Sequence, residues 1–93
     1  MKAGRKLQDL ISVGSAMLRD FELLGVKSVD GLARQEPVKM YKRLCSITGE
    51  RQNPCVLDVF SAAVAQARDP LLPTEQSQWW YWSRKRKAAD AHK

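Results

Sequence analysis

The sequence has few of the side chains that catalysis and metal binding require. Its single histidine, His92, lies near the C-terminus, and its only cysteines are Cys45 and Cys55. These residues cannot supply the three or four ligands of a zinc site, and no Ser/His/Asp set can be assembled in a core around one terminal histidine. We therefore expect no metal, no cofactor and no enzymatic activity.

Long hydrophobic runs are also absent. No apolar segment approaches the roughly 18 residues that cross a bilayer, and the basic start, Met1–Lys6, lacks the hydrophobic region of a signal peptide. The 93 residues leave room for one domain with a radius of gyration of about 12 Å. With 44% hydrophobic and 28% charged residues, the composition is typical of a folded protein. We expect a cytoplasmic monomer or weak dimer without membrane contact.

Positive charge is concentrated at the two ends of the chain. Of the net charge of +6, the segment before Leu7 contributes +3 and residues 84–93 contribute +4, whereas residues 7–83 carry −1. Basic ends can attract DNA or RNA, because each neutralised phosphate releases counterions, or they can simply keep a small protein in solution. The cations of the basic run near the C-terminus are Arg84, Lys85, Arg86 and Lys87.

Hydrophobic residues recur with helical spacing, and strand-like alternation is nearly absent. Leu7, Leu10 and Ile11 predict a short first helix, which the segment Ser12–Ser15 interrupts. An apolar face then predicts a second helix, and this helix should end at Gly25 because glycine adopts the left-handed conformation without a steric penalty. The residues of this face are Met17, Leu18, Phe21 and Leu24.

Capping signals place three further helices. Ser28 suits the N-cap of a short helical turn, Pro37 suits the first position of the next helix, and Asn53-Pro54 combines an N-cap with a first-turn proline. The last of these should be the central helix and should end at Asp69-Pro70. Its expected inward face is Val56, Val59, Phe60, Ala63, Val64 and Ala67, and that of the preceding helix is Val38, Tyr41, Leu44 and Cys45. The predicted fold class is all-α, with four to five short helices.

Four adjacent aromatic residues, Trp79, Trp80, Tyr81 and Trp82, precede the basic run. Three interpretations are open: a lid over the core, a surface for a protein partner, and a platform on which unpaired bases stack. The aromatic-then-basic order suits nucleic acid, because rings can stack on bases while cations pair with phosphates.

Cys45 and Cys55 end one predicted helix and begin the next. We expect both thiols to point into the same interior junction as small hydrophobic groups, because cytosolic disulfides are rare. A redox pair or half of a metal site is the alternative, although their ten-residue separation matches neither a CxxC pair nor a zinc-ligand pair.

The segment from Leu7 to Leu32 resembles a helix-hairpin-helix motif, in which two glycines flank one hydrophobic residue. Ser12 stands at the first glycine position, Val13 is the hydrophobic residue that would plug the turn into the core, and Gly14 matches the second glycine. Here the resemblance implies that the fold is built on such an element.

Amide groups make this hairpin a candidate phosphate site. The N–H groups of Gly14, Ser15 and Ala16 would lie at the start of the second helix, where unsatisfied donors and the helix dipole favour an anion. Ser15 stands where DNA-binding versions of the motif commonly carry a basic residue, and Arg19 is the nearest replacement. The alternative is a tight helix connection without a ligand.

The resemblance extends beyond the hairpin. The segments Pro37–Cys45, Asn53–Phe60, Ala62–Val64, Trp79–Trp82 and Arg84–Lys87 are similar to the small bacterial proteins of the pathogenicity-locus family, often labelled mitomycin resistance proteins. The hairpin half is also similar to the C-terminal domain of TfoX-type competence regulators. Membership implies a helical, helix-hairpin-helix-like domain with a link to DNA, and it identifies no reaction.

These features predict a non-catalytic, sequence-nonspecific DNA-binding module. Val13, Gly14, Ser15 and Ala16, together with Arg19, would hold backbone phosphates without reading bases, and the terminal Lys and Arg residues would supply long-range attraction.

The alternative function is a protein-interaction adaptor that binds through Trp79–Trp82 and whose hairpin is purely structural. An enzyme acting on a small molecule is suggested by the family label alone. The expected organisation is a basic N-terminal arm (1–6), a helix-hairpin-helix-like domain (7–69), a proline-bracketed connector with a Trp-rich cap (70–83) and a basic tail (84–93).

Overall fold

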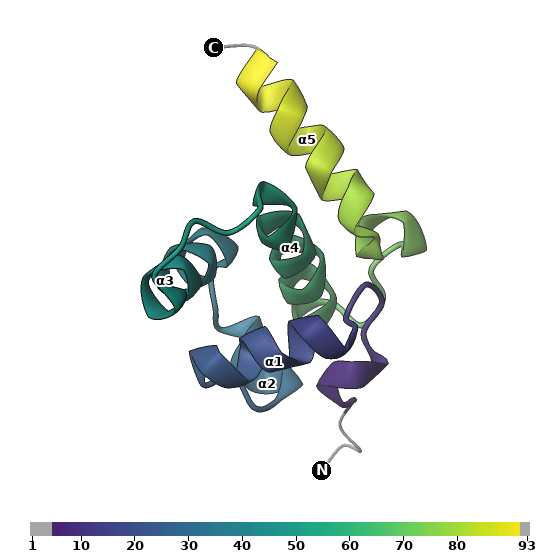
Figure 1. The fold of residues 1–93 in the computed structure, drawn as a ribbon. Coiled ribbons are helices and arrows are strands. Elements are labelled where there is room, and N and C mark those ends of the chain that lie inside the picture. Colours follow the sequence, from purple (N-terminus) through teal and green to yellow (C-terminus); the bar gives the residue numbers. More distant parts are fainter. Residues whose placement is uncertain (1–4, 92–93) are drawn as a thin grey trace.

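In the computed structural model, which describes residues 5–91, five α-helices and two short 3-10 helices follow one another without a strand (Figure 1). This confirms the all-α prediction. Lys2, His92 and Lys93 lie outside the described residues. The elements are η1 (Leu7–Asp9), α1 (Ser15–Leu24), α2 (Val29–Ala33), α3 (Pro37–Thr48), α4 (Pro54–Arg68), η2 (Thr74–Ser77) and α5 (Trp79–Ala91).

The helix boundaries predicted at Gly25, Ser28 and Asn53 are confirmed, and each depends on a local signal. Gly25 ends α1 with φ +77°, and the N–H of Val26 reaches back to the carbonyl of Phe21 at 2.9 Å. The Ser28 side chain accepts from the N–H of Gly31 at 3.0 Å, and Asn53 accepts from Cys55 at 2.8 Å.

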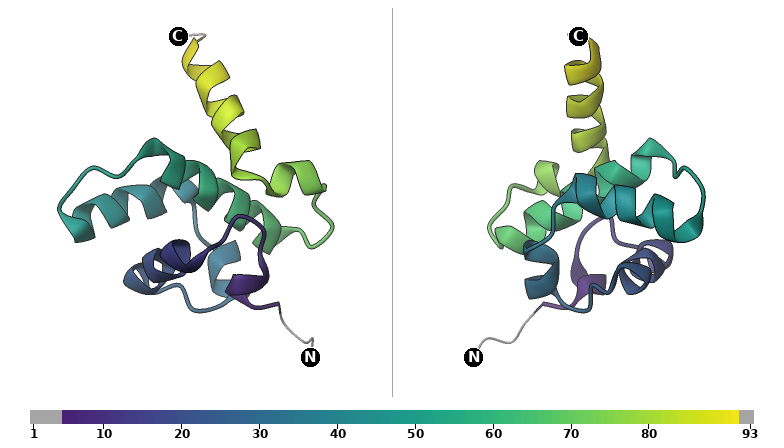
Figure 2. Two further views of the ribbon diagram at one scale, coloured as in Figure 1. Left: turned by 45° about the vertical axis from the view of Figure 1, so that its right-hand side comes forward. Right: turned by 90° about the vertical axis from the view of Figure 1, so that its left-hand side faces the viewer.

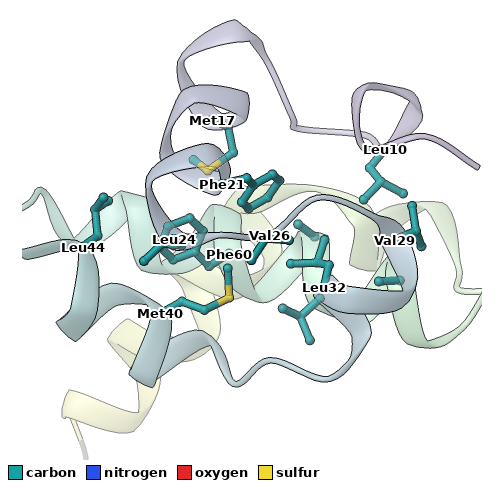
Figure 3. Close-up of a cluster of buried hydrophobic side chains, with 13 residues drawn as sticks. Leu10, Met17, Phe21, Leu24, Val26, Val29, Leu32, Met40, Leu44 and Phe60 are labelled. Carbon is teal, nitrogen blue, oxygen red and sulfur yellow. The ribbon is translucent and has the colours of Figure 1, made fainter. Parts of the chain in front are cut away.

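The central position of α4 is also confirmed, since it packs against α2, α3 and α5 (Figure 1). Phe60 of α4 stacks on Phe21 of α1 with ring centroids 6.0 Å apart, inside a cluster of buried hydrophobic side chains (Figure 3). Val56 and Val59 are half-buried and pack on this cluster. Burial of these apolar side chains is the main stabilising contribution to the fold.

The inward face of α3 differs from the prediction. Met40 is buried, whereas Val38 is 52% exposed. At about 100° per residue, Met40 shares its face with Leu44, and Val38 lies roughly 200° from Met40. The spacing of apolar residues in α3 allows either the face with Val38 or the face with Met40 to turn inward. Packing against α1 and α4 selects the face with Met40.

A second buried stripe on α4 was missed by the sequence analysis. Asp58, Ala62 and Gln66 recur every four residues and are all buried. Two of these side chains are polar, so the stripe does not appear in a search for apolar periodicity. Each polar member holds another part of the chain in place, as described below.

The first and last helical segments also differ from the sequence expectation. Leu7–Asp9 is one 3-10 turn, so an α-helix follows the hairpin but none precedes it in the described residues. The complete helix-hairpin-helix element is therefore not confirmed.

At the other end, α5 begins at Trp79 and runs through the basic segment, so the boundary expected between residues 83 and 84 falls inside one helix. The C-terminal half of α5 extends beyond the other helices (Figure 2). Its extension contributes to the elongated shape, 45 × 32 × 21 Å, with a radius of gyration of 13.0 Å.

Candidate functional site

The backbone of the hairpin turns at Ser12. This residue has φ +74° and is the one described non-glycine residue with a positive φ, whereas Gly14 has φ −103°, which any residue can adopt. Ser12 therefore adopts a left-handed conformation at the position where the motif has its first glycine. Val13 is half-buried and packs on the core, which confirms its predicted role as the plug of the turn.

The side chain of Ser12 joins the hairpin to the start of α5. Its Oγ donates to the carbonyl of Ser77 at 3.1 Å and accepts from the backbone N–H of Trp79 at 3.2 Å. The second bond satisfies a free N–H at the start of α5 and so acts as an N-cap supplied by a residue 67 positions away. The hairpin and the aromatic helix are thus adjacent.

Gln66 holds the other side of the hairpin. Its Oε1 accepts from the N–H of Ile11 at 2.9 Å, and its Nε2 donates to the carbonyl of Ile11 at 2.8 Å and to that of Ala62 at 3.2 Å. Both backbone groups of Ile11 are therefore paired with one buried side chain. No periodicity or motif in the sequence signals this contact.

The first amides of α1 are open, as the phosphate hypothesis requires. Gly14 is the N-cap and contributes no side-chain acceptor, and within residues 5–91 no hydrogen-bond partner is found for the N–H groups of Ser15 and Ala16. Gly14, Ser15 and Ala16 are all exposed. These N–H groups can donate to an anion, and the positive end of the helix dipole favours its negative charge.

A shallow groove of about 510 Å³ continues from these amides along α1. It contains two cations, Arg19 and Lys27, and one carboxylate, Glu22, so its charge is net positive. Asp20 follows Arg19 in the chain; burial raises the pKa of its carboxyl, and the Arg19 guanidinium partly opposes this shift. The lining residues are Ser15, Leu18, Arg19, Glu22, Val26 and Lys27.

The four aromatic residues of α5 divide into two pairs. Trp79 and Trp80 are 41% and 37% exposed. Tyr81 and Trp82 are half-buried and meet edge to face at 5.3 Å, and the indole N–H of Trp82 donates to the carbonyl of Gln76 at 2.8 Å. None of the four belongs to the core cluster or to the described side chains packed on it, so they do not form a lid over that core.

Basic side chains of α5 lie over these rings. The Arg84 guanidinium is 4.9 Å from the centroid of Trp80, and the Lys85 ammonium is 5.4 Å from Tyr81 and 5.8 Å from Trp82. Arg84, Lys85 and Lys87 are exposed. Their charge is therefore available to an external anion next to the aromatic pairs.

Arg86 was predicted to bind DNA, but its guanidinium faces the protein. Its Nε and Nη2 each donate to a carboxylate oxygen of Asp58 at 3.0 Å, and Asp58 is 1% exposed. This paired contact fastens α5 to α4. Within the basic run, Arg86 is thus a structural residue in this arrangement.

The prediction that both thiols are buried is wrong for Cys55, which is exposed at the start of α4. Cys45 is half-buried, and its Sγ accepts from the N–H of Gln52 at 3.4 Å. Within the described residues, no group of three or more His, Cys, Asp or Glu side chains is placed to hold a metal, and no helix has the length and hydropathy of a membrane span.

The bridge at Ser12 makes a testable prediction. Ser12→Ala should lower the free energy of unfolding by about 1–2 kcal/mol, because it removes two hydrogen bonds and keeps the Cβ that the left-handed region disfavours. Ser12→Gly loses the same bonds but adopts positive φ without steric cost, so we expect a smaller loss. Urea unfolding of the two variants provides the comparison. Equal losses would contradict a strained backbone at this position.

Comparison of the sequence with known proteins identifies the family of this chain. The model of the pathogenicity locus family matches residues 1–88. The chain is 36% identical over 84 residues to the mitomycin resistance protein McrB of Streptomyces lavendulae, covering 90% of this chain and 76% of that protein. No solved structure matches. The resemblance seen in the sequence is therefore confirmed, and the chain belongs to the pathogenicity locus family.

Proposed function

We propose that this protein is a non-catalytic module that binds DNA through its phosphate backbone without sequence preference. The observation that carries the proposal is the bridge at Ser12, which joins the hairpin with its open amides to Trp79, the first residue of the helix that carries the aromatic and basic side chains. Two features that are more than 60 residues apart in the sequence thereby form one candidate surface.

The two parts of this surface would act differently. At the hairpin, the N–H groups of Ser15 and Ala16 would bind a phosphate oxygen at close range, and Arg19 would add charge one turn further along α1. On α5, Arg84 and Lys87 are one turn apart and would contact further phosphates. Amides and cations that bind phosphates carry no sequence information, so base identity should matter little.

Gly14 offers a clean test of the hairpin. A Cβ at Gly14 would meet no atom within 4 Å, and its φ of −103° suits any residue, so Gly14→Val should fold normally. A phosphate bound at the neighbouring amides would meet the new side chain, so we expect DNA affinity to fall about tenfold. Fluorescence anisotropy with a labelled duplex at low salt measures this change. If the folded variant binds as tightly as the original protein, the hairpin is not the site.

The basic part is tested by the salt dependence of binding. Truncation after Ser83 would also remove Arg86 and its bond to Asp58, so substitution is the better experiment. The double variant Arg84→Gln/Lys87→Gln should reduce the slope of log K against log salt by up to about 2, because two fewer phosphates are neutralised. A matched double variant at the exposed cations Lys42 and Arg51, away from this surface, should leave the slope unchanged.

The adaptor function is the second candidate, and it is favoured by the exposure of Trp79 and Trp80. Exposed indoles that are held on a rigid helix are typical centres of protein interfaces. The same titration separates the two functions. Absence of binding to any DNA at low salt would reject the DNA-binding proposal and favour the adaptor.

A further inference from the structure

We infer that the DNA bound by this surface contains unpaired bases, and that Trp79 and Trp80 stack on them. The inference rests on the proposed function and names its substrate class, single-stranded DNA. The starting observation is the division of the four aromatic residues. Tyr81 and Trp82 are half-buried and engaged with each other, whereas Trp79 and Trp80 present about two fifths of their surface to solvent.

The backbone of Trp79 is held in place, and its ring is free to receive a ligand. Its backbone N–H is bound to Ser12 Oγ, at the point where the hairpin meets α5. Within the described residues, its ring has no aromatic or cationic partner and its indole N–H has no acceptor. We therefore assign Trp79 as the aromatic residue nearest the hairpin along α5.

Trp80 begins an exposed stripe that fits the chemistry of a single strand. Arg84 and Lys87 follow it at the fourth and seventh positions, so all three lie on one face of α5, and all three are exposed. The Arg84 guanidinium already lies over the Trp80 ring at 4.9 Å. An exposed ring on the same helix face as two cations can hold a base by stacking, while the cations pair with its phosphates.

Duplex DNA cannot use this arrangement fully. Its bases are stacked on one another, and only their edges face the grooves. An unpaired base exposes a whole ring face, and stacking on an aromatic side chain tolerates any base. The same two indoles therefore favour single strands while they preserve the lack of sequence preference.

The experiment compares a labelled single strand of about 12 nucleotides with the duplex of the same sequence, using the full chain. Wild-type protein should bind the single strand more tightly. Trp79→Leu and Trp80→Leu should each weaken single-strand binding about tenfold and change duplex binding by less than about twofold. Ile47→Ala, which shortens an exposed apolar residue of α3, is the matched control and should change neither.

Salt separates stacking from charge in the same experiment. Stacking releases no condensed counterions, so the tryptophan variants should give lines of log K against log salt parallel to that of wild type. Trp80→Phe should recover part of the affinity. Thermal unfolding verifies that each variant is folded.

The possible failures are distinguishable. If duplex binds as tightly as single strand, or if neither leucine variant weakens single-strand binding, the inference is overturned while the proposed DNA binding stands. If wild-type protein binds neither DNA at low salt, both the inference and the proposed function are rejected.

Discussion

Replacing Arg86 by alanine is expected to lower the free energy of unfolding by about 3–5 kcal/mol, because the Asp58 carboxylate would remain buried without its partner. The guanidinium bonds both carboxylate oxygens, so removal of the side chain leaves both oxygens without this donor. In a domain of this size, that loss should lower the melting temperature by at least about 12 °C. Thermal and urea unfolding followed by circular dichroism measure the effect.

Two further variants test whether loss of the ion pair causes the destabilisation of Arg86→Ala. Lys87→Ala removes a neighbouring, exposed cation of the same helix and should change the free energy of unfolding by less than about 0.5 kcal/mol. The double variant Asp58→Leu/Arg86→Met replaces the pair by apolar side chains and should recover most of the loss. A stability of Arg86→Ala equal to that of wild type would show that this ion pair does not fasten α5 to α4.

Gln66→Leu is expected to lower the free energy of unfolding by roughly 2–3 kcal/mol. The leucine has a similar volume, but it leaves the N–H and the carbonyl of Ile11 without their side-chain partner at the edge of the hairpin. Urea unfolding measures the global effect, and hydrogen exchange of the Ile11 amide measures the local one. We expect faster exchange at Ile11 and weaker DNA binding, because the adjacent turn would no longer be held in place.

Gln8 supplies the control for this change. Its side chain is exposed and lies in η1, close to the hairpin in the sequence, so Gln8→Leu should leave both measurements unchanged. Unaltered exchange at Ile11 in Gln66→Leu would contradict a role of Gln66 in positioning the hairpin.

Helix boundaries were predictable because their signals are local. Gly25, Ser28 and Asn53 each act on backbone groups within a few residues of themselves, and the structure places all three as expected. The start of the chain was harder to predict. Leu7, Leu10 and Ile11 have helical spacing, but so short a segment gains too few hydrogen bonds to offset the cost of helix nucleation, and one 3-10 turn results.

The candidate site was only partly predictable. The exposed amides of Ser15 and Ala16 follow from the position of the helix start, which the sequence indicates. The inward orientation of Arg86 could not be predicted, because in the sequence it is one of four consecutive cations and its partner is 28 residues away. Cys55 shows the same limit, since its exposure depends on how α4 is rotated against its neighbours.

The amino-acid sequence alone determined where most helices begin and end, which family the chain belongs to and where its charge is concentrated. These properties depend on neighbouring residues or on composition. Tertiary structure alone decided that Ser12 joins the hairpin to α5, that Gln66 holds Ile11 and that Arg86 is paired with Asp58. Each of these contacts joins polar groups between 28 and 67 residues apart, and such pairs form only when packing of the apolar core brings the helices together.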